Sequence, residues 1–406
     1  MGPRVSRGRI TVVGLDGRPL DEKIERLLTD AALVAGGGRH LEMLGVDRNR
    51  AVVLEGDLSE AFARIEGSEG PVVVLASGDP GFFGIVRLLG ERFGREDLCV
   101  FPGLSSVALA FARAGLSWDD AVTVSAHGRD PRRAINVCRA YPKVAVLTSP
   151  YFGPAELAEA FDGLDRTFVI AEKLGETGER VFHGDPGTVA GMEWEDPNVV
   201  LVLDERRMPG ARGWISSGIM AQGRWALSEE EFEHRSGMIT KSATRAFVLS
   251  RLGPGPGDLI WDVGAGSGSV AIECARLGAA VIVIERDPES CARIRRNADH
   301  HGVRLQIMEA MAPETLRDLP EPDAVFIGGS GGAFEEIVKL SAVRARRAVV
   351  LALVTLERVV PAAQLLEDCG LEVETTFLQT SRMKGLGNLH RLAAESAVFV
   401  VSGSRT

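Results

Sequence analysis

The chain alternates short apolar runs with longer amphipathic stretches along most of its 406 residues. Short apolar runs between turn residues are typical of buried strands, and a helical period in a longer stretch indicates a helix. In the first half we expect strands at residues 10–13, 72–76, 98–101, 121–125, 143–148, 167–171 and 199–203, and helices at 21–32, 105–114 and 155–161. This order predicts an α/β fold.

The second half repeats the two patterns more regularly. We expect helices at residues 240–252, 269–277, 289–301, 334–346 and 356–369, and strands at 259–263, 281–285, 305–309, 324–327, 348–354, 371–379 and 396–402. Strands and helices in strict alternation predict a doubly wound, Rossmann-like sheet with a predominantly parallel core.

The composition of the sequence changes between residues 208 and 224, where Gly, Pro and Ser are frequent, as they are in linkers. Shortly afterwards, Ser228 and Glu231 have the spacing of a capping box, which predicts the start of a helical segment. We therefore divide the chain into a domain at residues 1–208, a linker at 209–232 and a domain at 233–406. Each flanking half has enough apolar pattern for a core of its own.

The most specific signal lies in residues 258–287. An apolar strand leads into a glycine turn, a helix follows, and the next strand ends on Glu285. A dinucleotide site requires GxGxxG, but this turn reads GxGxG and Ser269 stands where the third glycine would be. Glu285 lies where a carboxylate accepts hydrogen bonds from both ribose hydroxyls. The arrangement suits S-adenosylmethionine (SAM), which has a ribose and no phosphate, and it disfavours a dehydrogenase.

Four loops of small or polar residues follow predicted strands in the first half, beginning near Ser77, Pro102, Ser125 and Thr148. Open α/β sheets bind ligands at the carboxyl ends of their strands, so we expect these loops to line one edge of a crevice. Taken alone, each loop can also be an ordinary turn followed by a helix cap, with no ligand bound. Their shared position after strands favours a binding site.

The charge and cysteine content of the chain limit the kinds of molecule that it is expected to bind. The chain has 46 Lys and Arg residues against 56 Asp and Glu residues, a net charge of −10, and neither half has the basic excess of a nucleic-acid-binding protein. Five scattered cysteines in no CxxC pair favour a reducing cytosol and disfavour a disulfide framework or a zinc site. Apolar runs are too short to span a bilayer, and the N-terminus does not read as a signal peptide. We expect a cytoplasmic protein with no membrane, nucleic-acid or metal partner.

Motifs in both halves resemble a known family. Gly78-Asp79-Pro80, Pro102-Gly103-x-Ser105-Ser106 and Ser125-x-His127-Gly128-Arg129 are similar to the motifs of the tetrapyrrole (corrin/porphyrin) methylases. The second half, from Met238-Ile-Thr240-Lys241 through the glycine turn to Val354-Thr-Leu-Glu357, resembles the class I SAM-dependent methyltransferase domain that is fused to the methylase domain in one branch of that family. The resemblance covers nearly the whole chain.

The resemblance implies a bifunctional enzyme of cobalamin biosynthesis. Such an enzyme methylates a precorrin at C5 with the first domain, methylates it at C15 with the second, and removes the acetate carboxyl group at C12. It implies two SAM sites per chain and a tetrapyrrole substrate. Little acid–base machinery is needed when the nucleophile is an electron-rich ring carbon, because alignment of the reactants supplies much of the rate. We therefore assign no catalytic residue.

The motifs carry the family's site residues onto this chain. The implied cofactor-binding residues are Gly78, Asp79, Phe82, Ser105 and Ser106 in the first half, and Thr240, Gly264, Ala265, Gly266, Ser267, Gly268, Glu285, Ala310 and Ala312 in the second. Cationic side chains suit the carboxylates of the substrate. The candidates for this role are His127, Arg129, Lys241, Arg382 and His390, with Arg132, Arg133, Arg245, Lys384 and Arg391 as further cations.

The chain departs from the family pattern in its first loop, where Gly14-Leu-Asp16-Gly17 replaces a Gly-x-Gly-Pro-Gly run. Two other functions stay open at this stage. One is a SAM-dependent small-molecule or tRNA methyltransferase with an accessory domain, and the other is a non-catalytic SAM-sensing protein. Two bound SAM molecules per chain would favour the fused enzyme, and turnover would exclude the sensor. We also expect a homo-oligomer.

Overall fold

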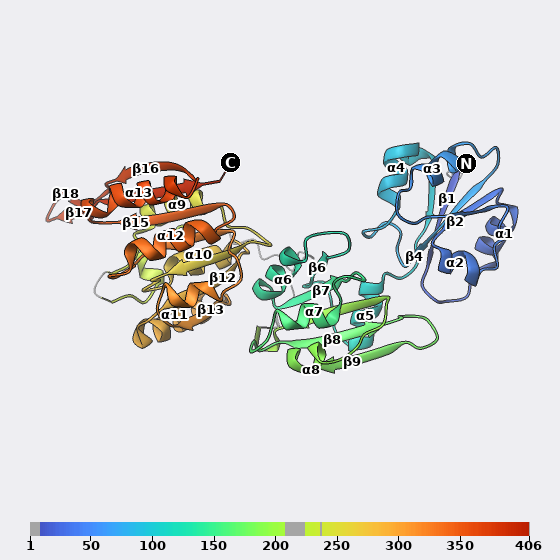
Figure 1. Cartoon of the computed structure of the whole chain (residues 1–406), viewed down its shortest axis with the longest axis horizontal. Helices are drawn as coiled ribbons and strands as arrows, with labels where there is room; N and C mark the ends of the chain where they lie inside the picture. The colour runs from blue at the N-terminus through green and yellow to red at the C-terminus, as the bar shows by residue number, and fades with distance from the viewer. Residues whose placement is uncertain (1–8, 208–223, 236–237, 406) are drawn as a thin grey trace. The chain divides into compact units, whose positions relative to one another are not determined.

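The structure is a computed structural model that describes residues 9–207, 224–235 and 238–405 (Figure 1). Its residues group into two compact units, Met1–Asp119 with Thr123–Arg129 and Ala145–Leu203, and Asp120–Val122 with Asp130–Val144 and Asp204–Thr406. Residues 209–223 of the expected linker lie outside the described residues. The domain boundary at 209–232 therefore stays a prediction.

The first sheet has five parallel strands in the order β3-β2-β4-β1-β5, and β1 lies between β4 and β5 with Ile10 opposite both Val72 and Leu98. The strands are β1 (Ile10–Leu15), β2 (Leu33–Gly36), β3 (Ala51–Val53), β4 (Val72–Ser77) and β5 (Leu98–Phe101). The helices are α1 (Glu22–Asp30), α2 (Gly38–Met43), α3 (Ser59–Glu66), α4 (Val86–Phe93) and α5 (Ser106–Ala114). The central strands β1 and β4 are almost wholly apolar and buried, as strands covered on both faces must be.

The second sheet has the order β6-β7-β10-β8-β9, in which β10, β8 and β9 pair antiparallel. Its strands are β6 (Val122–Ser125), β7 (Lys143–Leu147), β8 (Thr167–Glu172), β9 (Arg180–Gly184) and β10 (Asn198–Leu203), and the helices in this stretch of the chain are α6 (Pro131–Ala140), α7 (Pro154–Glu159) and α8 (Pro186–Ala190). Residues 130–144, with α6, group with the second unit, where Arg132 donates to Asp323 at 2.6 Å and Asn136 donates to the Gly257 carbonyl at 3.0 Å.

These two sheets correct one expectation. The loops after β4 and β5 belong to the first sheet, whereas the loops after β6 and β7 belong to the second. The four loops therefore do not line one edge of one sheet. The short strand β6 follows α5 closely in sequence but pairs in a different sheet, and periodicity does not report this change of partner.

The third sheet has seven strands in the order β13-β12-β11-β14-β15-β19-β16, with the first five parallel and the last two antiparallel to their neighbours. The strands are β11 (Leu259–Val263), β12 (Ala280–Glu285), β13 (Gln306–Glu309), β14 (Ala324–Ile327), β15 (Ala348–Leu353), β16 (Glu372–Leu378) and β19 (Val398–Ser404). The helices are α9 (Ser242–Leu252), α10 (Ser269–Arg276), α11 (Pro288–His300), α12 (Phe334–Arg344) and α13 (Val359–Asp368). The doubly wound sheet expected from the sequence is confirmed.

Alternate residues of the strands face two separate cores. Ile260 and Val283 pack with residues of α9, α10 and α11, whereas Trp261 and Ile282 pack with α12 and α13 on the other face. Figure 1 shows these helices along the sheet of the second unit. The helices cover the two faces of the sheet, and the loops that carry the candidate site follow the carboxyl ends of the parallel strands.

A hairpin of β17 (Ser381–Leu386) and β18 (Leu389–Ala394) extends from the third sheet between β16 and β19. Because Leu378 of β16 pairs with Val398 and Leu353 of β15 pairs with Phe399, the hairpin leaves the sheet at the carboxyl end of the parallel strands. This is the edge at which the glycine turn lies.

The expected capping box at Ser228 and Glu231 is wrong. Residues Glu229–Glu231 form a single 3-10 turn, and the Ser228 side chain makes no capping hydrogen bond. Instead, the Glu229 carboxylate accepts the backbone N–H of Ser242 at 2.7 Å and so caps the N-terminus of α9.

Candidate functional site

The glycine turn of the second unit links β11 to α10 through three residues in the left-handed region. Gly264, Gly266 and Gly268 have φ of 69°, 58° and 74°. A Cβ at Gly264 would lie 2.2 Å from the Gly329 carbonyl oxygen, so only glycine allows this close packing. A Cβ at Gly266 would meet nothing within 4 Å. The turn thus packs tightly on its inner side and leaves open space at its apex.

Glu285 ends β12 directly beside this turn. One carboxylate oxygen accepts the N–H of Gly266 at 3.0 Å, and the other accepts the N–H of Asp287 at 3.0 Å. The side chain is only partly buried, and each carboxylate oxygen can accept more than one hydrogen bond. Glu285 is therefore held in one position with acceptor capacity left for a ligand, and its contact with a ribose stays a prediction.

The other expected residues of this site surround the turn. Ala265 accepts the N–H of Gly268 at 2.9 Å, and Ala310 donates its N–H to the Glu285 carbonyl at 3.1 Å. Ala312 packs against the core beneath α12 and α13. Ser267 is buried, and its carbonyl accepts a hydrogen bond at 3.0 Å from Asn297, which the motif analysis did not find.

Asp262 lies at the end of β11, immediately behind the turn, and is 1% exposed. One of its oxygens accepts the N–H of Ala271 at 3.0 Å, while Oδ1 has no hydrogen-bond partner among the described residues. Burial raises the pKa of this carboxyl group to about 7. The side chain anchors the first turn of α10 and is easily protonated.

The cationic candidates of the second unit gather near the N-terminus of α9. Lys241 occupies the cap position of that helix, and the Arg382 guanidinium donates to the Ser242 hydroxyl at 2.8 Å. Arg382 also pairs with Glu229 at 3.0 Å and Glu395 at 2.8 Å. His390 is exposed on β18.

Arg245 is not available to a substrate, contrary to the expectation that it is a carboxylate-binding cation. It is fully buried and lies 3.3 Å from Glu273, which is also fully buried. Its guanidinium donates to the carbonyls of Thr240, at 2.7 Å, and Leu227. Arg245 thus holds Thr240 in place from inside the domain.

In the first unit, the loops after β1, β4 and β5 converge because these strands are neighbours. A Cβ at Gly14 would lie 2.0 Å from the Gly78 carbonyl oxygen and 2.4 Å from the Gly103 nitrogen. Gly78 has φ of 58° and donates its N–H to the Leu15 carbonyl at 2.6 Å. Three segments far apart in sequence thus meet backbone to backbone.

Asp16, which replaces part of the family's glycine run, joins two of these loops. Its side chain is 6% exposed, and Oδ2 accepts the N–H of Leu104 at 2.8 Å. The Arg18 guanidinium lies 2.6 Å from the same oxygen, and this hydrogen bond is the main cause that lowers the pKa of Asp16. The departure from the family pattern was the only signal in the sequence for this contact.

The expected cofactor residues of the first unit lie on these loops. Asp79 accepts the N–H of Gly81 at 2.8 Å, and Ser105 caps α5 by accepting the N–H of Ala108 at 3.1 Å. Phe82 packs edge to face with Phe83, and Ser106 is the first residue of α5. Ser105 thus caps its helix, whereas Asp79 does not cap the next helix, α4, which has Ile85 at its cap position and no side-chain cap. Binding of SAM by these residues stays a prediction.

His127 and Arg129 are exposed on the loop after β6, in the second sheet. The His127 N–H donates to the Ser125 hydroxyl at 3.3 Å, and the Arg129 N–H donates to the Ala126 carbonyl at 3.4 Å. The backbone of this loop is thus held by hydrogen bonds within the loop. Among the described residues, neither the His127 nor the Arg129 side chain has a hydrogen-bond partner.

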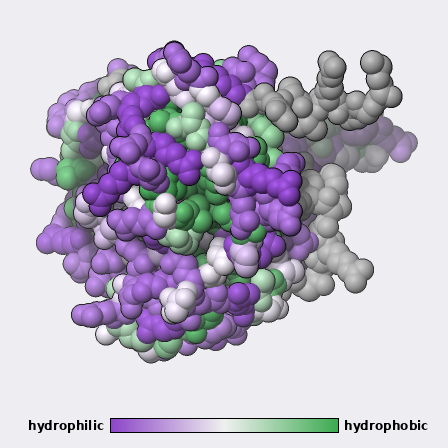
Figure 2. All heavy atoms as spheres, turned by 90° about the vertical axis from the view of Figure 1, so that its right-hand side faces the viewer, coloured by the Kyte–Doolittle hydropathy of each residue, from purple (hydrophilic) through white to green (hydrophobic). Residues whose placement is uncertain are grey.

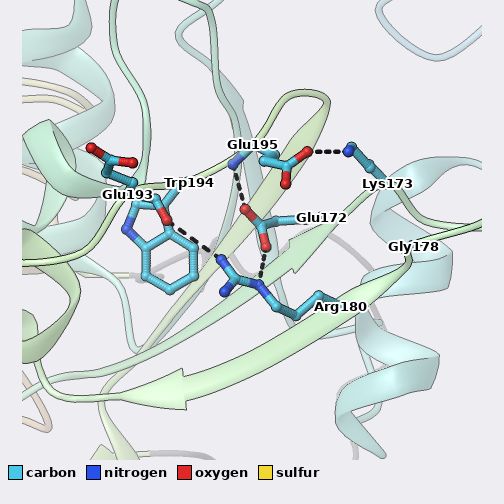
Figure 3. A pocket seen from close by; sticks show the side chains of 7 residues that line it. All are labelled: Glu172, Lys173, Gly178, Arg180, Glu193, Trp194 and Glu195. Carbon is cyan, nitrogen blue, oxygen red and sulfur yellow. Dashed lines mark hydrogen bonds and ion pairs between the residues drawn. The ribbon is translucent and has the colours of Figure 1, made fainter.

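A separate cavity of about 330 Å³ lies beside β8 and β9 and contains none of the expected site residues (Figure 3). Arg180 pairs with Glu172 and stacks over Trp194 at 5.0 Å, and Lys173 pairs with Glu195. Two of the three carboxylates that line it, Glu172 and Glu195, are therefore already paired within the protein.

Over residues 9–207, 224–235 and 238–405, no group of three or more His, Cys, Asp or Glu side chains has the arrangement of a metal site. Within the same described part of the chain, every helix is too short or too polar to cross a membrane.

Two family models match the chain. Residues 11–190 match the Tetrapyrrole (Corrin/Porphyrin) Methylases, and residues 230–404 match the Precorrin methyltransferase domain. A precorrin-6Y C(5,15)-methyltransferase (decarboxylating) from Sinorhizobium sp is 39% identical over 343 residues, which cover 81% of this chain and 80% of that relative. The chain belongs to this family of precorrin methyltransferases.

Two shorter relatives carry separate names for the two methylations. A cobalt-precorrin-7 C(5)-methyltransferase from Salmonella typhimurium is 34% identical over 211 residues, which cover 48% of this chain and 100% of the relative. A probable cobalt-precorrin-6B C(15)-methyltransferase (decarboxylating) from Pyrobaculum calidifontis is 32% identical over 183 residues, covering 43% of this chain and 94% of the relative. Each precorrin methyltransferase of this kind is thus about half as long as the present chain.

Proposed function

We propose that this chain methylates a precorrin at C5 and C15 and removes the acetate carboxyl group at C12, converting precorrin-6B to precorrin-8X in cobalamin biosynthesis. The observation that carries the proposal is the 39% identity to a precorrin-6Y C(5,15)-methyltransferase over four-fifths of both chains. The glycine turn, with Glu285 bonded to the N–H of Gly266, supports it at the level of the site.

We infer that each half binds one SAM molecule. In the second unit, the open space at Gly266 and the free acceptor capacity of Glu285 fit a ribose laid across the turn. In the first unit, Gly14, Gly78 and Gly103 bring backbone together at the ends of β1, β4 and β5 and carry no side chains of their own. A ligand can approach such backbone closely.

SAM supplies an activated methyl group on a positive sulfur atom. The residues of this chain then have to hold the ring carbon in line with that methyl group and keep water away, which accounts for much of the barrier in favourable cases. The exposed apolar side chains Phe83 and Leu104, on the loops after β4 and β5, offer surface for an apolar macrocycle. Figure 2 views the side of the molecule that carries the N-terminal part of the first unit, where apolar residues gather among hydrophilic ones.

The substrate carboxylates need cations. We propose that Lys241, Arg382 and His390 serve the second site and that His127 and Arg129 serve the first. Arg382 is 46% exposed despite its pairs with Glu229 and Glu395, and Lys384 and Arg391 lie opposite each other on the same hairpin. Removal of CO2 from an acetate arm additionally requires that its carboxylate be desolvated while the others stay bound.

The division of labour is tested by product analysis. Wild-type enzyme with precorrin-6B and SAM should give two methyl gains and one CO2 loss in the mass spectrum. Asp79→Ala should give a singly methylated, decarboxylated product, and a variant that lacks Glu285 should fail in the second methylation and the decarboxylation together. A doubly methylated product from Asp79→Ala at the wild-type rate would overturn the assignment of the first site, and binding without turnover would indicate a sensor.

We further propose that the two halves fold and bind SAM when they are expressed separately, as residues 1–208 and as a second fragment that begins at residue 224 and so keeps the buried Leu227 and Phe232. Mixing them should restore the full reaction, more slowly at low concentration because the fusion raises the effective concentration of the intermediate. The contacts of Arg132 with Asp323 and of Asn136 with Gly257 oppose this independence. Insolubility of either half would show that the boundary is misplaced.

A homo-oligomer and a cytoplasmic location complete the proposal. Met383, Leu386, Leu389 and Leu392 are 59–72% exposed on the hairpin, which is unusual for surface that stays in water. Light scattering coupled to size exclusion tests the oligomeric state. Cys99, Cys274, Cys291 and Cys369 are free thiols, as expected in a reducing compartment.

A further inference from the structure

A strap of residues 226–235 precedes α9 and is held against the second unit by buried groups. The backbone N–H groups of Ala226 and Leu227 donate to the Glu273 carboxylate at 3.1 and 2.7 Å. The side chains of Leu227 and Phe232 are 7% and 4% exposed and belong to the core formed with α9, α10 and α11. The strap is thus an integral part of the methyltransferase domain.

Asn297 of α11 links this strap to the glycine turn. Its side chain is 3% exposed, Oδ1 accepts the N–H of Glu233 at 2.8 Å, and Nδ2 donates to the Glu233 carbonyl at 2.9 Å. The same Nδ2 group donates to the Ser267 carbonyl at 3.0 Å. Both amide protons and the amide oxygen are therefore used, and Ser267 lies between Gly266 and Gly268.

Only an amide satisfies all three backbone groups. A carboxylate at this position would accept the Glu233 N–H but would repel the two carbonyl oxygens, and alanine would leave the buried Ser267 carbonyl and both backbone groups of Glu233 without this partner. The strap keeps its other anchors in either case, because Glu273 and Arg245 bind residues 226 and 227 independently of Asn297.

We propose that Asn297 is a positioning residue that couples the strap to the SAM-binding turn. It acts through Ser267, whose carbonyl it holds, and so fixes the backbone from which Gly266 donates to Glu285. The inference rests on the proposed SAM site of the second unit. SAM binding at the turn should accordingly tighten the strap, although the strap itself lies outside the motif.

The first measurement uses the full-length chain and follows CO2 release as a function of SAM concentration. Asn297→Ala should raise the KM for SAM about tenfold with a smaller change in kcat, because one well-made buried contact is lost from the binding turn. Asn297→Asp should be at least as impaired. Methylation at C5 should keep the wild-type KM in both variants.

Arg296→Ala is the matched control. Arg296 is the neighbouring residue on α11 and pairs with the side chain of the same strap residue, Glu233, at 2.9 Å on the surface, but it does not contact the turn. This variant should keep the wild-type KM. If Asn297→Ala behaves like Arg296→Ala while wild-type enzyme binds SAM at the second site, the inference is wrong. If wild-type enzyme binds no SAM there, the proposed function fails instead.

Hydrogen exchange on wild-type enzyme provides a test that needs no variant. Saturating S-adenosylhomocysteine should slow exchange at the Glu233 N–H, which Asn297 accepts, more than at the N–H groups of Ala226 and Leu227, which Glu273 accepts. Exchange at Glu233 that is unaffected by the ligand would contradict the coupling, even if Asn297→Ala does not fold.

Discussion

The two candidate SAM sites are built in opposite ways. In the second unit, one stretch of about thirty residues supplies the turn and Glu285, and side chains hold the backbone in place. In the first unit, three segments around Gly14, Gly78 and Gly103 meet from neighbouring strands, and the absence of side chains is what lets them meet. The second site should therefore be sensitive to the loss of side chains, and the first to their addition.

Two buried aspartates show the same contrast in electrostatics. Asp262 lies behind the second site without a cation beside it, and burial raises its pKa to about 7. Asp16 lies in the first site with Arg18 against it, and this partner lowers its pKa. The same residue type is thus easily protonated in one site and firmly ionised in the other.

The largest effect is expected from pH acting on Asp262. Its folded pKa of about 7 lies above the ordinary value of 3.8 for an aspartate, so the folded state binds more protons than the unfolded state between these values. The contribution of Asp262 to the free energy of unfolding is therefore most favourable below about pH 4. It falls by roughly 1.4 kcal/mol for each pH unit above that, and the fall ends at about pH 7 after a total of about 4 kcal/mol.

Urea unfolding of wild-type enzyme and Asp262→Asn at pH 5, 6 and 7 measures this effect. The variant should gain stability relative to wild type as the pH rises. Asp287→Asn is the control, because hydrogen bonds to Ser290 lower the pKa of Asp287. Ionisation of Asp287 therefore makes no contribution to the change of stability between pH 5 and pH 7. A constant difference between wild type and Asp262→Asn would show that Asp262 ionises normally.

The next largest effect concerns Glu285. Glu285→Ala removes the carboxylate that we propose as the acceptor of two ribose hydroxyls, and hydrogen bonds to charged groups contribute about 1.5–3 kcal/mol each. The KM for SAM in CO2 release should therefore rise at least about 100-fold. Glu309→Ala removes an exposed carboxylate from the paired position on β13 and should leave the KM unchanged. Equal SAM affinity of the two variants would show that Glu285 does not hold the ribose.

Adding a methyl group at Gly14 should damage only the first site. The new Cβ would lie 2.0 Å from the Gly78 carbonyl oxygen, and overpacking of this kind costs about 1–3 kcal/mol. Gly14→Ala should abolish the C5 product while CO2 release continues. Gly37→Ala adds the same group where the nearest atom is 3.8 Å away, and it should keep both activities. If Gly14→Ala methylates C5 at the wild-type rate, close contact between the backbones at Gly14, Gly78 and Gly103 is not required for the first site.

The smallest effect is expected at Asp16, because a single hydrogen bond joins it to the Leu104 N–H. Asp16→Ala should raise the KM for SAM in C5 methylation about tenfold, whereas Asp16→Asn keeps an acceptor and should lie between it and wild type. Arg18→Ala removes only the ion pair and should change the KM little. A large effect of Arg18→Ala would mean that the charge, rather than the hydrogen bond, holds the loop.

The charge pattern alone favours solvated helix faces for the arginines of α11 and α12, but two of these arginines pack against the protein. Arg293 is 7% exposed and pairs with Glu289, and Arg344 lies over the buried ring of Trp261 at 5.5 Å. Both side chains bury their stems while their guanidinium groups find partners. The spacing of Glu289 and Arg293 is visible in the sequence, whereas the contact of Arg344 with Trp261 is not, because Trp261 is distant in sequence.

The sequence by itself determined the α/β class, every strand of the third sheet and the position of the glycine turn, because periodicity and glycine spacing are local properties. It did not reveal β2, β3 or β9, which are short strands at or near sheet edges. Tertiary structure alone decided that the first-half loops belong to two sheets, that Arg245 is buried on Glu273, and that Asn297 bonds to Ser267. These features depend on which distant segments become neighbours, and no local pattern of residues specifies that.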